Sequence, residues 1–254
     1  MTEIWSYRHL VKKIALNELK LRYKNSVLGL FWSLLEPLLI FIVLYFVFSY
    51  LMKLNMEHYQ LFLFLGIICW DLFEKGTTMG LYSVTSKPSL VKKVYFPREV
   101  LVVGMCLTAL LMITFEFVVF FAFMLFLGVI PPQTAVVFPF ILLGEFLIVI
   151  GLSLFLSALN VYYKDVQYIW SVLLRALFFL TPVIYPVSIY PPQYAGLFLL
   201  NPIARVVEAS RKTLIYNALP NISDIAIIYA SAIIALAIGY IVFMKLEPRF
   251  AEEV

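Results

Sequence analysis

The chain has 254 residues, of which 63% are hydrophobic and 13% are charged, and its formal net charge is +4. A soluble domain of this length needs a far more highly charged surface, so the composition excludes an ordinary water-soluble protein. The mean hydropathy of +0.97 indicates a membrane protein instead. The apolar runs are continuous and do not alternate every second residue, which disfavours a transmembrane β-barrel.

Six apolar runs are each long enough to cross a bilayer, which takes about 20 predominantly apolar residues. The connections between them are short and are polar or rich in proline, so they leave no room for a separate soluble domain. We therefore expect an all-α membrane protein that forms one domain over residues 1–254. The expected spans are 27–51, 59–84, 100–129, 135–160, 166–185 and 224–244.

The N-terminal segment, residues 1–25, places apolar side chains such as Val11, Ile14 and Leu21 at helical spacing, with basic residues mostly on the other faces. This pattern predicts an amphipathic helix that lies at the membrane surface.

Basic residues are distributed unequally between the two sides that six alternating spans would define. Of the 19 Lys and Arg residues, 13 fall on the side of the two termini and four on the other side. The positive-inside bias therefore predicts cytoplasmic termini. Membrane insertion accounts for this charge pattern, so no nucleic-acid partner is expected.

The second span is polar in its second half. Asp71 and Lys75 are four residues apart, so they can pair on one helix face. Gly76 and Gly80 have the small-residue spacing that lets helices approach closely. We therefore expect this helix to be buried between its neighbours.

Other ionisable residues stand alone within the predicted spans. A carboxylate at this depth is costly, so we expect Glu36 to face protein or water. For the same reason Glu116 and Glu145 should be buried and partnered, and Arg175 must pair or meet water. Cys69 and Cys106 lie within spans and predict neither a disulfide framework nor a metal site.

Two connections carry unusual sequences. Residues 87–98 mix apolar and basic side chains between two prolines, which is typical of a docking surface, although packing against the span ends is the alternative. Residues 186–222 contain apolar stretches that are too short to span. They predict short helices that dip back into the membrane at the outer mouth of a pathway, because re-entrant backbone needs protein or a cavity around it.

The sequence contains no GxxxxGK(S/T) loop, so the chain is not expected to hydrolyse ATP. A membrane-embedded enzyme is disfavoured, because His9 and His58 are far apart and on opposite predicted sides. A chain that consists almost entirely of predicted membrane-spanning segments is most simply interpreted as a transport pathway. Transport would be driven by a partner or by a gradient. A gradient-driven transporter would depend on Asp71, Glu74 or Glu145.

Four segments in order along the chain resemble the membrane subunit of type-2 ABC exporters, specifically the group that exports O-antigen, capsule or teichoic-acid polymers. Lys164 departs from the resemblance, because members of this group often carry Arg before the Asp. The segments are 19–32 followed by Glu36-Pro37, 90–99, 159–185, and Asn201-Pro202 with Arg205 and Arg211.

The resemblance implies a homodimer in the bacterial inner (plasma) membrane, together with two copies of a separate ATPase that binds ATP and Mg. No cofactor is expected in this chain itself, and the substrate would be a lipid-linked glycan. An alternative within the same topology is a permease for drugs or small lipids. The segment 87–98 would couple the chain to the ATPase through Pro88, Leu90, Lys92, Lys93, Tyr95, Phe96, Pro97 and Arg98.

The resemblance also implies a channel lined by the first and fifth spans, with residues 186–222 as its outer gate. Arg22, Lys24 and Arg98 would form a cationic entrance for the diphosphate of the lipid-linked substrate. The candidates for an aromatic channel wall are Trp32, Trp170, Phe178, Phe179 and Tyr185.

Overall fold

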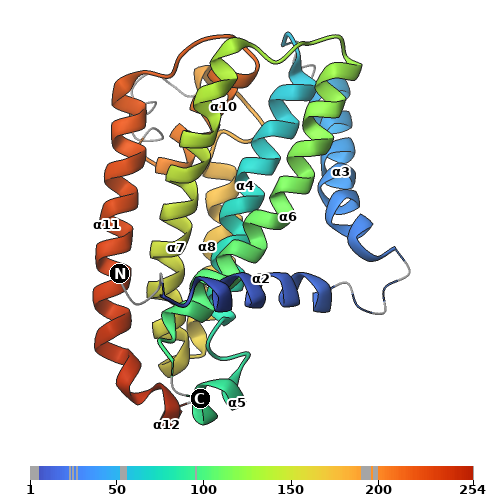
Figure 1. The fold of residues 1–254 in the computed structure, drawn as a ribbon. Helices are drawn as coiled ribbons and strands as arrows, with labels where there is room; N and C mark the ends of the chain where they lie inside the picture. Colours follow the sequence, from blue (N-terminus) through green and yellow to red (C-terminus); the bar gives the residue numbers. More distant parts are fainter. Residues whose placement is uncertain are drawn as a thin grey trace.

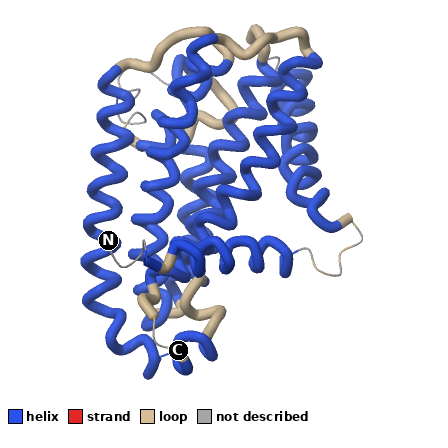
Figure 2. The backbone as a smooth tube through the Cα atoms, in the orientation of Figure 1, coloured by secondary structure: helices blue, strands red, loops and turns tan. Residues whose placement is uncertain are grey.

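The protein is represented by a computed structural model that describes residues 6–22, 24, 26, 28–51, 56–94, 96–189, 196 and 200–253. These residues form a bundle of long helices joined by loops, and no strand occurs among them (Figures 1 and 2). The all-helical fold class is therefore confirmed for this part of the chain.

The helices follow one another in a simple order. They are α2 (Arg8–Arg22), α3 (Trp32–Tyr45, continued by a π-helical turn, Phe46–Leu51), α4 (Tyr59–Tyr82), α5 (Pro88–Lys93), α6 (Glu99–Phe126), α7 (Phe138–Tyr162), α8 (Asp165–Leu180), α10 (Pro202–Leu214), α11 (Ile222–Leu246) and α12 (Phe250–Glu253).

Within the described residues, four helical segments are long and apolar enough to cross a membrane. They contain α3, α6, α7 and α11. The helix α4 is also long but carries Asp71, Glu74 and Lys75, and α8 has only 16 residues. The four segments are Trp32–Tyr50, Glu99–Phe126, Gln133–Tyr162 and Ile222–Glu253.

Two predicted spans differ from the observed helices by five residues at one end. The first was expected from residue 27, but the α-helix begins at Trp32 after a short 3-10 turn that includes Gly29 with φ of +52°. The fifth was expected to reach residue 185, but α8 ends at Leu180. Thr181 is extended because it precedes Pro182, and a residue before proline avoids the helical conformation.

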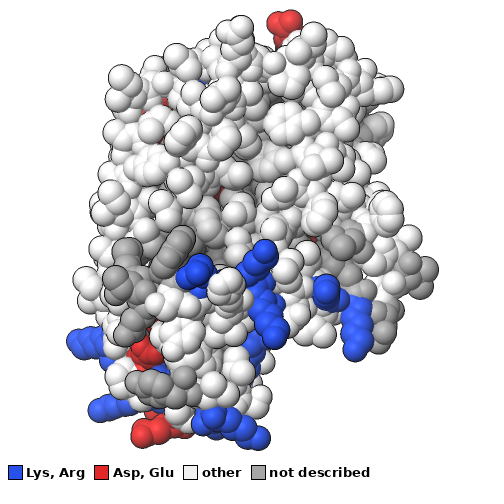
Figure 3. Space-filling model, viewed as in Figure 1, with Lys and Arg blue, Asp and Glu red and all other residues white. Residues whose placement is uncertain are grey.

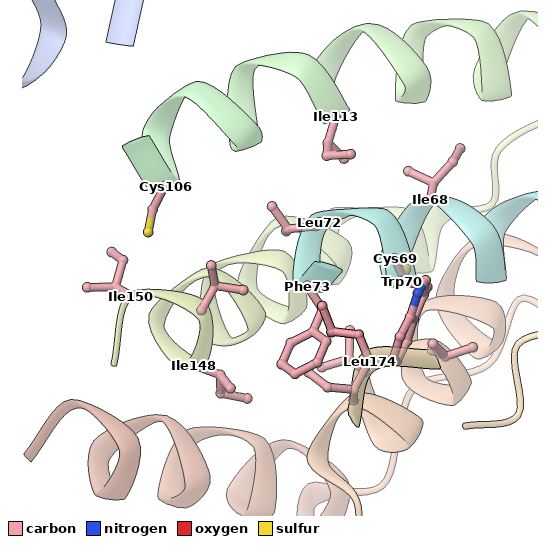
Figure 4. Close-up of a cluster of buried hydrophobic side chains, with 14 of the residues drawn as sticks. Ile68, Cys69, Trp70, Leu72, Phe73, Cys106, Ile113, Ile148, Ile150 and Leu174 are labelled. Atoms are coloured by element: carbon pink, nitrogen blue, oxygen red, sulfur yellow. The ribbon is translucent and has the colours of Figure 1, made fainter. Parts of the chain in front are cut away.

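The helix α4 is the centre of the bundle, as its predicted burial implied. Nearly all of its first half is buried, whereas few side chains of α3 and α8 are buried. In Figure 4, Ile68, Leu72 and Phe73 of α4 lie among side chains from α6, α7 and α8, such as Ile113 and Leu174. The core is thus a layer of apolar side chains around one helix.

Glycines allow two pairs of helices to approach closely. A Cβ on Gly76 would collide with Val149 of α7, and one on Gly80 would collide with Ser153, which confirms the expected close approach of α4. The contact between α7 and α11 is closer still. There Gly239 lies against the backbone of Gly151, so neither helix has room for a side chain.

The helix α2 lies across the long helices (Figure 1), and its buried residues are Val11, Ile14, Ala15 and Leu19. It packs on the first turns of α6, where a Cβ on Gly104 would lie 2.8 Å from Ile14. The predicted helix is confirmed, and Val11 and Ile14 lie on its buried face as expected. Leu21 does not, because it is 58% exposed beyond the contact with α6.

The end of the bundle that carries α2, α5 and α12 is called the basic end here. Lys and Arg side chains gather at this end, and the rest of the visible face is nearly uncharged (Figure 3). The helix α10 and the connection between α6 and α7 lie toward the opposite end (Figure 1). The predicted concentration of basic residues on one side of the molecule is therefore seen on this face.

The contact between α7 and α11 makes a prediction about stability. Replacing Gly239 with Leu forces the two backbones apart, and overpacking of this kind costs about 1–3 kcal/mol. We expect a lower midpoint of thermal unfolding for the purified protein in detergent. The matched control is Ala237→Leu, an exposed position on the same helix, which should change the midpoint little. Equal midpoints for the two variants would contradict the close contact.

Candidate functional site

Two hollows lie along α3 and share Ile40 as a lining residue. The first hollow has a volume of about 540 Å³, and the second about 300 Å³. We call the two together the α3–α8 groove. Its first part is lined by Arg22, Ser26, Trp32, Glu36, Leu39 and Ile40, and its second part by Ile40, Leu44, Ile67, Trp70, Asp71, Glu74, Leu174, Arg175, Phe178 and Phe179.

Charged side chains of α3, α4 and α8 are exposed in this groove within the length of each helix. Glu36 of α3, Glu74 of α4 and Arg175 of α8 are all exposed. Arg175 lies about 15 Å along α8 from the start of that helix, and Glu74 lies about 12 Å before the end of α4. Glu36 lines the open first hollow, and its expected separation from lipid stays a prediction.

Behind the groove, one lysine joins two carboxylates. The Nζ of Lys75 donates to Oδ2 of Asp71 at 2.7 Å and to Oε1 of Glu116 at 2.9 Å. The predicted pair of Asp71 and Lys75 is confirmed, and Glu116 of α6 has the partner that its burial requires. This network fixes α4 against α6 and holds Asp71 at the floor of the groove.

Glu145 does not follow the same expectation. Its side chain in α7 is fully buried, yet neither carboxyl oxygen has a hydrogen-bond partner among the residues that the structure describes. The sequence could place this acid at depth but could not show which neighbour faces it. Across the described segments, no group of three or more His, Cys, Asp and Glu residues could hold a metal ion.

Three of the five predicted wall aromatics lie in the groove. Trp32 lines its first hollow and is 47% exposed, and Phe178 and Phe179 line the second. Phe179 is 64% exposed, so its ring is accessible over most of its surface.

The other two predicted wall aromatics are placed differently. Trp170 is buried against α4, where its indole N–H donates to Oγ1 of Thr77 at 3.1 Å and its ring meets Phe73 edge to face. The hydroxyl of Tyr185 donates to the backbone carbonyl of Phe179, and Tyr185 lines neither hollow. Trp170 therefore packs between α8 and α4 and does not line the groove, because only one face of α8 is turned toward the groove.

The three residues predicted for a cationic entrance are not brought together. Arg22 lines the groove, and Lys24 is exposed just beyond the end of α2. Arg98 instead lines a separate hollow of about 340 Å³ with Tyr7 and Glu247. Because α2 is a rigid helix of 15 residues, about 22 Å long, it holds Arg22 and Arg98 near its opposite ends.

The predicted coupling segment forms α5 and the turn after it, at the basic end. Of the residues predicted to couple, Pro88, Lys92 and Lys93 are exposed, and Leu90, Pro97 and Arg98 are half-buried. Phe96 is buried, which corrects its expected place on a docking surface: it packs against the span ends. Tyr95 lies outside the described residues.

Sequence reasoning missed how this segment is attached. Lys87, just before α5, forms an ion pair with Glu18 of α2. At the other end, the backbone N–H of Arg98 donates to Oε1 of Glu247 at 3.1 Å. No local pattern marks these pairs, because their partners are far away in the sequence.

The predicted outer gate, residues 186–222, is described only in part, since 190–195 and 197–199 lie outside the described residues. In the described part, α10 is largely buried, and its Arg211 is fully buried. The guanidinium donates to the backbone carbonyls of Pro182 at 2.6 Å and Val183 at 2.7 Å, and it pairs with Glu208 at 3.0 Å. It also stacks on the ring of Phe62, 3.3 Å from the centroid.

The unwound end of α8 is held by two further side chains. Nδ2 of Asn201 donates to Oγ1 of Thr181 at 2.9 Å, and the hydroxyl of Tyr59 donates to the carbonyl of Ile184 at 3.0 Å. The Thr-Pro pair that ends α8 is visible in the sequence, and it signals free carbonyl groups nearby. The side chains that satisfy those carbonyls could not be predicted from it.

Known proteins with similar sequences define the family. The profile of the family described as "ABC-2 type transporter" matches residues 9–215. This chain belongs to that family, a class of multi-pass membrane permease subunits, and the resemblance seen in the sequence is confirmed.

Three relatives illustrate the range of the family. The "O-antigen export system permease protein RfbA" of Klebsiella pneumoniae is 31% identical to this chain over 92% of the chain and 91% of the relative. The protein of the same name from Myxococcus xanthus is 30% identical over 99% and 98%. The "Polysialic acid transport protein KpsM" of Escherichia coli is 23% identical over 80% of each protein.

The lysine behind the groove makes a prediction. Lys75→Met leaves the buried carboxylates of Asp71 and Glu116 without their cation, and breaking a buried pair costs about 3–5 kcal/mol. We expect the midpoint of thermal unfolding in detergent to fall clearly. Adding Asp71→Asn and Glu116→Gln to the Lys75→Met variant removes the two unpaired carboxylates and should largely restore the midpoint. Arg175→Gln, at an exposed position, is the control and should unfold near the wild-type temperature. A wild-type midpoint for Lys75→Met would exclude the proposed role of the network.

Proposed function

We propose that this chain is the channel-forming membrane subunit of an ATP-driven exporter. Its substrate is a lipid-linked polysaccharide of the O-antigen kind, which it carries from the cytoplasm across the bacterial inner membrane. The family and the names of the relatives support the transport of a polysaccharide.

The observation that carries this proposal is the exposure of Glu36, Glu74 and Arg175 in one groove. A charged side chain at bilayer depth faces protein or water, because exposure to lipid costs several kcal/mol (about 3 or more on insertion scales). The face formed by α3, α4 and α8 is therefore not a lipid-facing surface. It suits one wall of a water-filled pathway.

The proposal includes six spans in a single domain. At 1.5 Å per residue, α4 is about 36 Å long and α8 is about 24 Å long, and both run within the bundle of the four apolar helices. The helix α10 is too short to cross a bilayer and is buried on several elements, which suits a re-entrant outer gate. The basic end then faces the cytoplasm and carries both termini.

A second copy of the chain would close the pathway. The groove is open in one chain, and α3 and α8 expose many apolar side chains on either side of it. Two copies that face each other about a two-fold axis would enclose a channel between their grooves. The exposed apolar residues are Leu39, Ile40, Ile42, Val43, Ile169, Val172 and Leu173.

The energy would come from two copies of a partner ATPase, which bind ATP and Mg. Lys92 and Lys93 are exposed on α5 and would contact that partner, as the resemblance implies. Arg22, at the basic end of the groove, together with Lys24, would meet the substrate diphosphate, since Arg and Lys are common phosphate partners.

The groove is tested by an export assay in cells that depend on this chain for their surface polysaccharide. Phe179→Ala removes an exposed ring from the groove and should lower the rate of export several-fold, because a sliding sugar chain loses a stacking face. Tyr168→Ala removes an equally exposed ring of α8 that does not line the groove, and it should export normally. Normal export by Phe179→Ala, or by cells that lack the chain, would contradict the proposal.

The coupling role is tested by co-purification with the partner ATPase. Reversing both charges in Lys92→Glu/Lys93→Glu should reduce the ATPase recovered at least several-fold, while the chain unfolds at the wild-type temperature, because both side chains are exposed. Lys24→Glu reverses an exposed charge at the far end of α2 and should retain the partner. An undiminished yield of ATPase with the double variant would count against the coupling segment.

A further inference from the structure

The charges along the α3–α8 groove do not balance. Glu36, Asp71 and Glu74 line it, and Arg175 is the cation among the residues of its second hollow. The Lys75 ammonium lies just behind, but it is shared between Asp71 and Glu116. Arg22 of the first hollow is a third cation, so four carboxylates face three cations over these seven described side chains, and beyond Arg22 four carboxylates face two cations.

The excess of carboxylates is concentrated where a polymer would pass. Glu36 and Glu74 are exposed to the groove, and neither of them touches Lys75, which is bonded to the other two acids. Because low-dielectric walls focus the field of such groups into the enclosed water, their effect on a passing chain is larger than on an open surface.

We infer that the groove selects a polysaccharide without negative charge, and that Glu36 and Glu74 are the residues that determine this specificity. This inference rests on the proposed function. The hydroxyl groups of neutral sugars donate hydrogen bonds to carboxylates, and the exposed ring of Phe179 offers them an apolar face. Acidic sugars would bring a like charge past the carboxylates of both copies, and rings of Asp and Glu exclude anions from pores in this way.

The sign of the charge changes along the groove. Arg22 lies in the first hollow, at the basic end, and the acids follow from Glu36 onward. The diphosphate anchor of a substrate thus finds a cation at the mouth, and the carboxylates act on the sugar chain. The relative named for polysialic acid transport handles an acidic polymer, so the selectivity inferred here distinguishes this chain from that relative.

The test compares two polymers in inverted membrane vesicles that contain the chain and its partner ATPase. The first probe is a neutral polyhexose, and the second is the same polymer with a uronic acid in every repeat, both of equal length and on the same lipid diphosphate. We expect the wild-type complex to transport the neutral polymer about tenfold faster or more, a ratio that one to two like-charge encounters can produce.

Variants assign the selectivity to residues. Glu36→Gln/Glu74→Gln should raise the ratio of acidic to neutral transport at least fivefold, because the amides keep the shape and remove the charge. Arg175→Gln, which removes a charge of opposite sign from the same groove, should leave that ratio low or lower it. Should the double variant fail to assemble, Glu36→Gln alone should shift the ratio in the same direction by a smaller factor.

The outcomes separate this inference from the function on which it rests. Equal transport of both polymers by the wild type, or a ratio that the glutamine variants leave unchanged, overturns the inference and leaves polysaccharide export intact. Transport of neither polymer by the wild type, with the ATPase bound and active, overturns the proposed function itself.

Discussion

The cost of placing charge at bilayer depth is the constraint on which this bundle depends. Lys75 and its two carboxylates meet that cost by pairing inside the protein, where they also hold α4 against α6. Glu36, Glu74 and Arg175 are instead exposed on one face. Since lipid would penalise them, that face needs water or a second copy of the chain beside it. The same energetic rule thus explains both the rigid centre of the molecule and the position of its groove.

The outer end of the groove depends on the end of α8 and on the hydrogen bonds that satisfy the carbonyl groups after it. Thr181 and Pro182 end the helix and leave backbone carbonyls without helical donors, which is costly in a membrane. Arg211 satisfies two of those carbonyls while it also contacts Phe62. A single buried guanidinium therefore joins α10 and α4 to the turn after α8, where it satisfies the carbonyls of Pro182 and Val183.

Much of the fold could be predicted from the sequence, because runs of apolar residues and the positions of Pro, Gly and charge act locally. The pair of Asp71 and Lys75 is one helical turn apart, so the sequence contains the whole interaction. For the groove, the sequence could predict which helices form it, but it could not predict which of their side chains face it. Which face of α8 turns toward α3 decides that Phe179 is exposed and Trp170 is buried, and this depends on tertiary packing. Similarly, Arg22 and Arg98 are basic residues on one side of the membrane in the sequence, but the rigid length of α2 keeps them apart.

The attachments at the basic end indicate how motion could reach the groove. The predicted coupling segment, residues 87–98, is tied to α2 through Lys87 and Glu18, and to the end of α11 through Arg98 and Glu247. The helix α2 is packed on α6, and α11 is locked to α7 by Gly239 and Gly151. A displacement of α5 is therefore delivered to α6 and α7, the well-packed part of the bundle. The helix α3 buries only Ser33, Pro37 and Phe41, so it can move relative to the rest, whereas Trp170 ties α8 to α4. Because the groove lies between α3 and α8 over α4, movement of α3 would change its width without disturbing the buried network of Lys75.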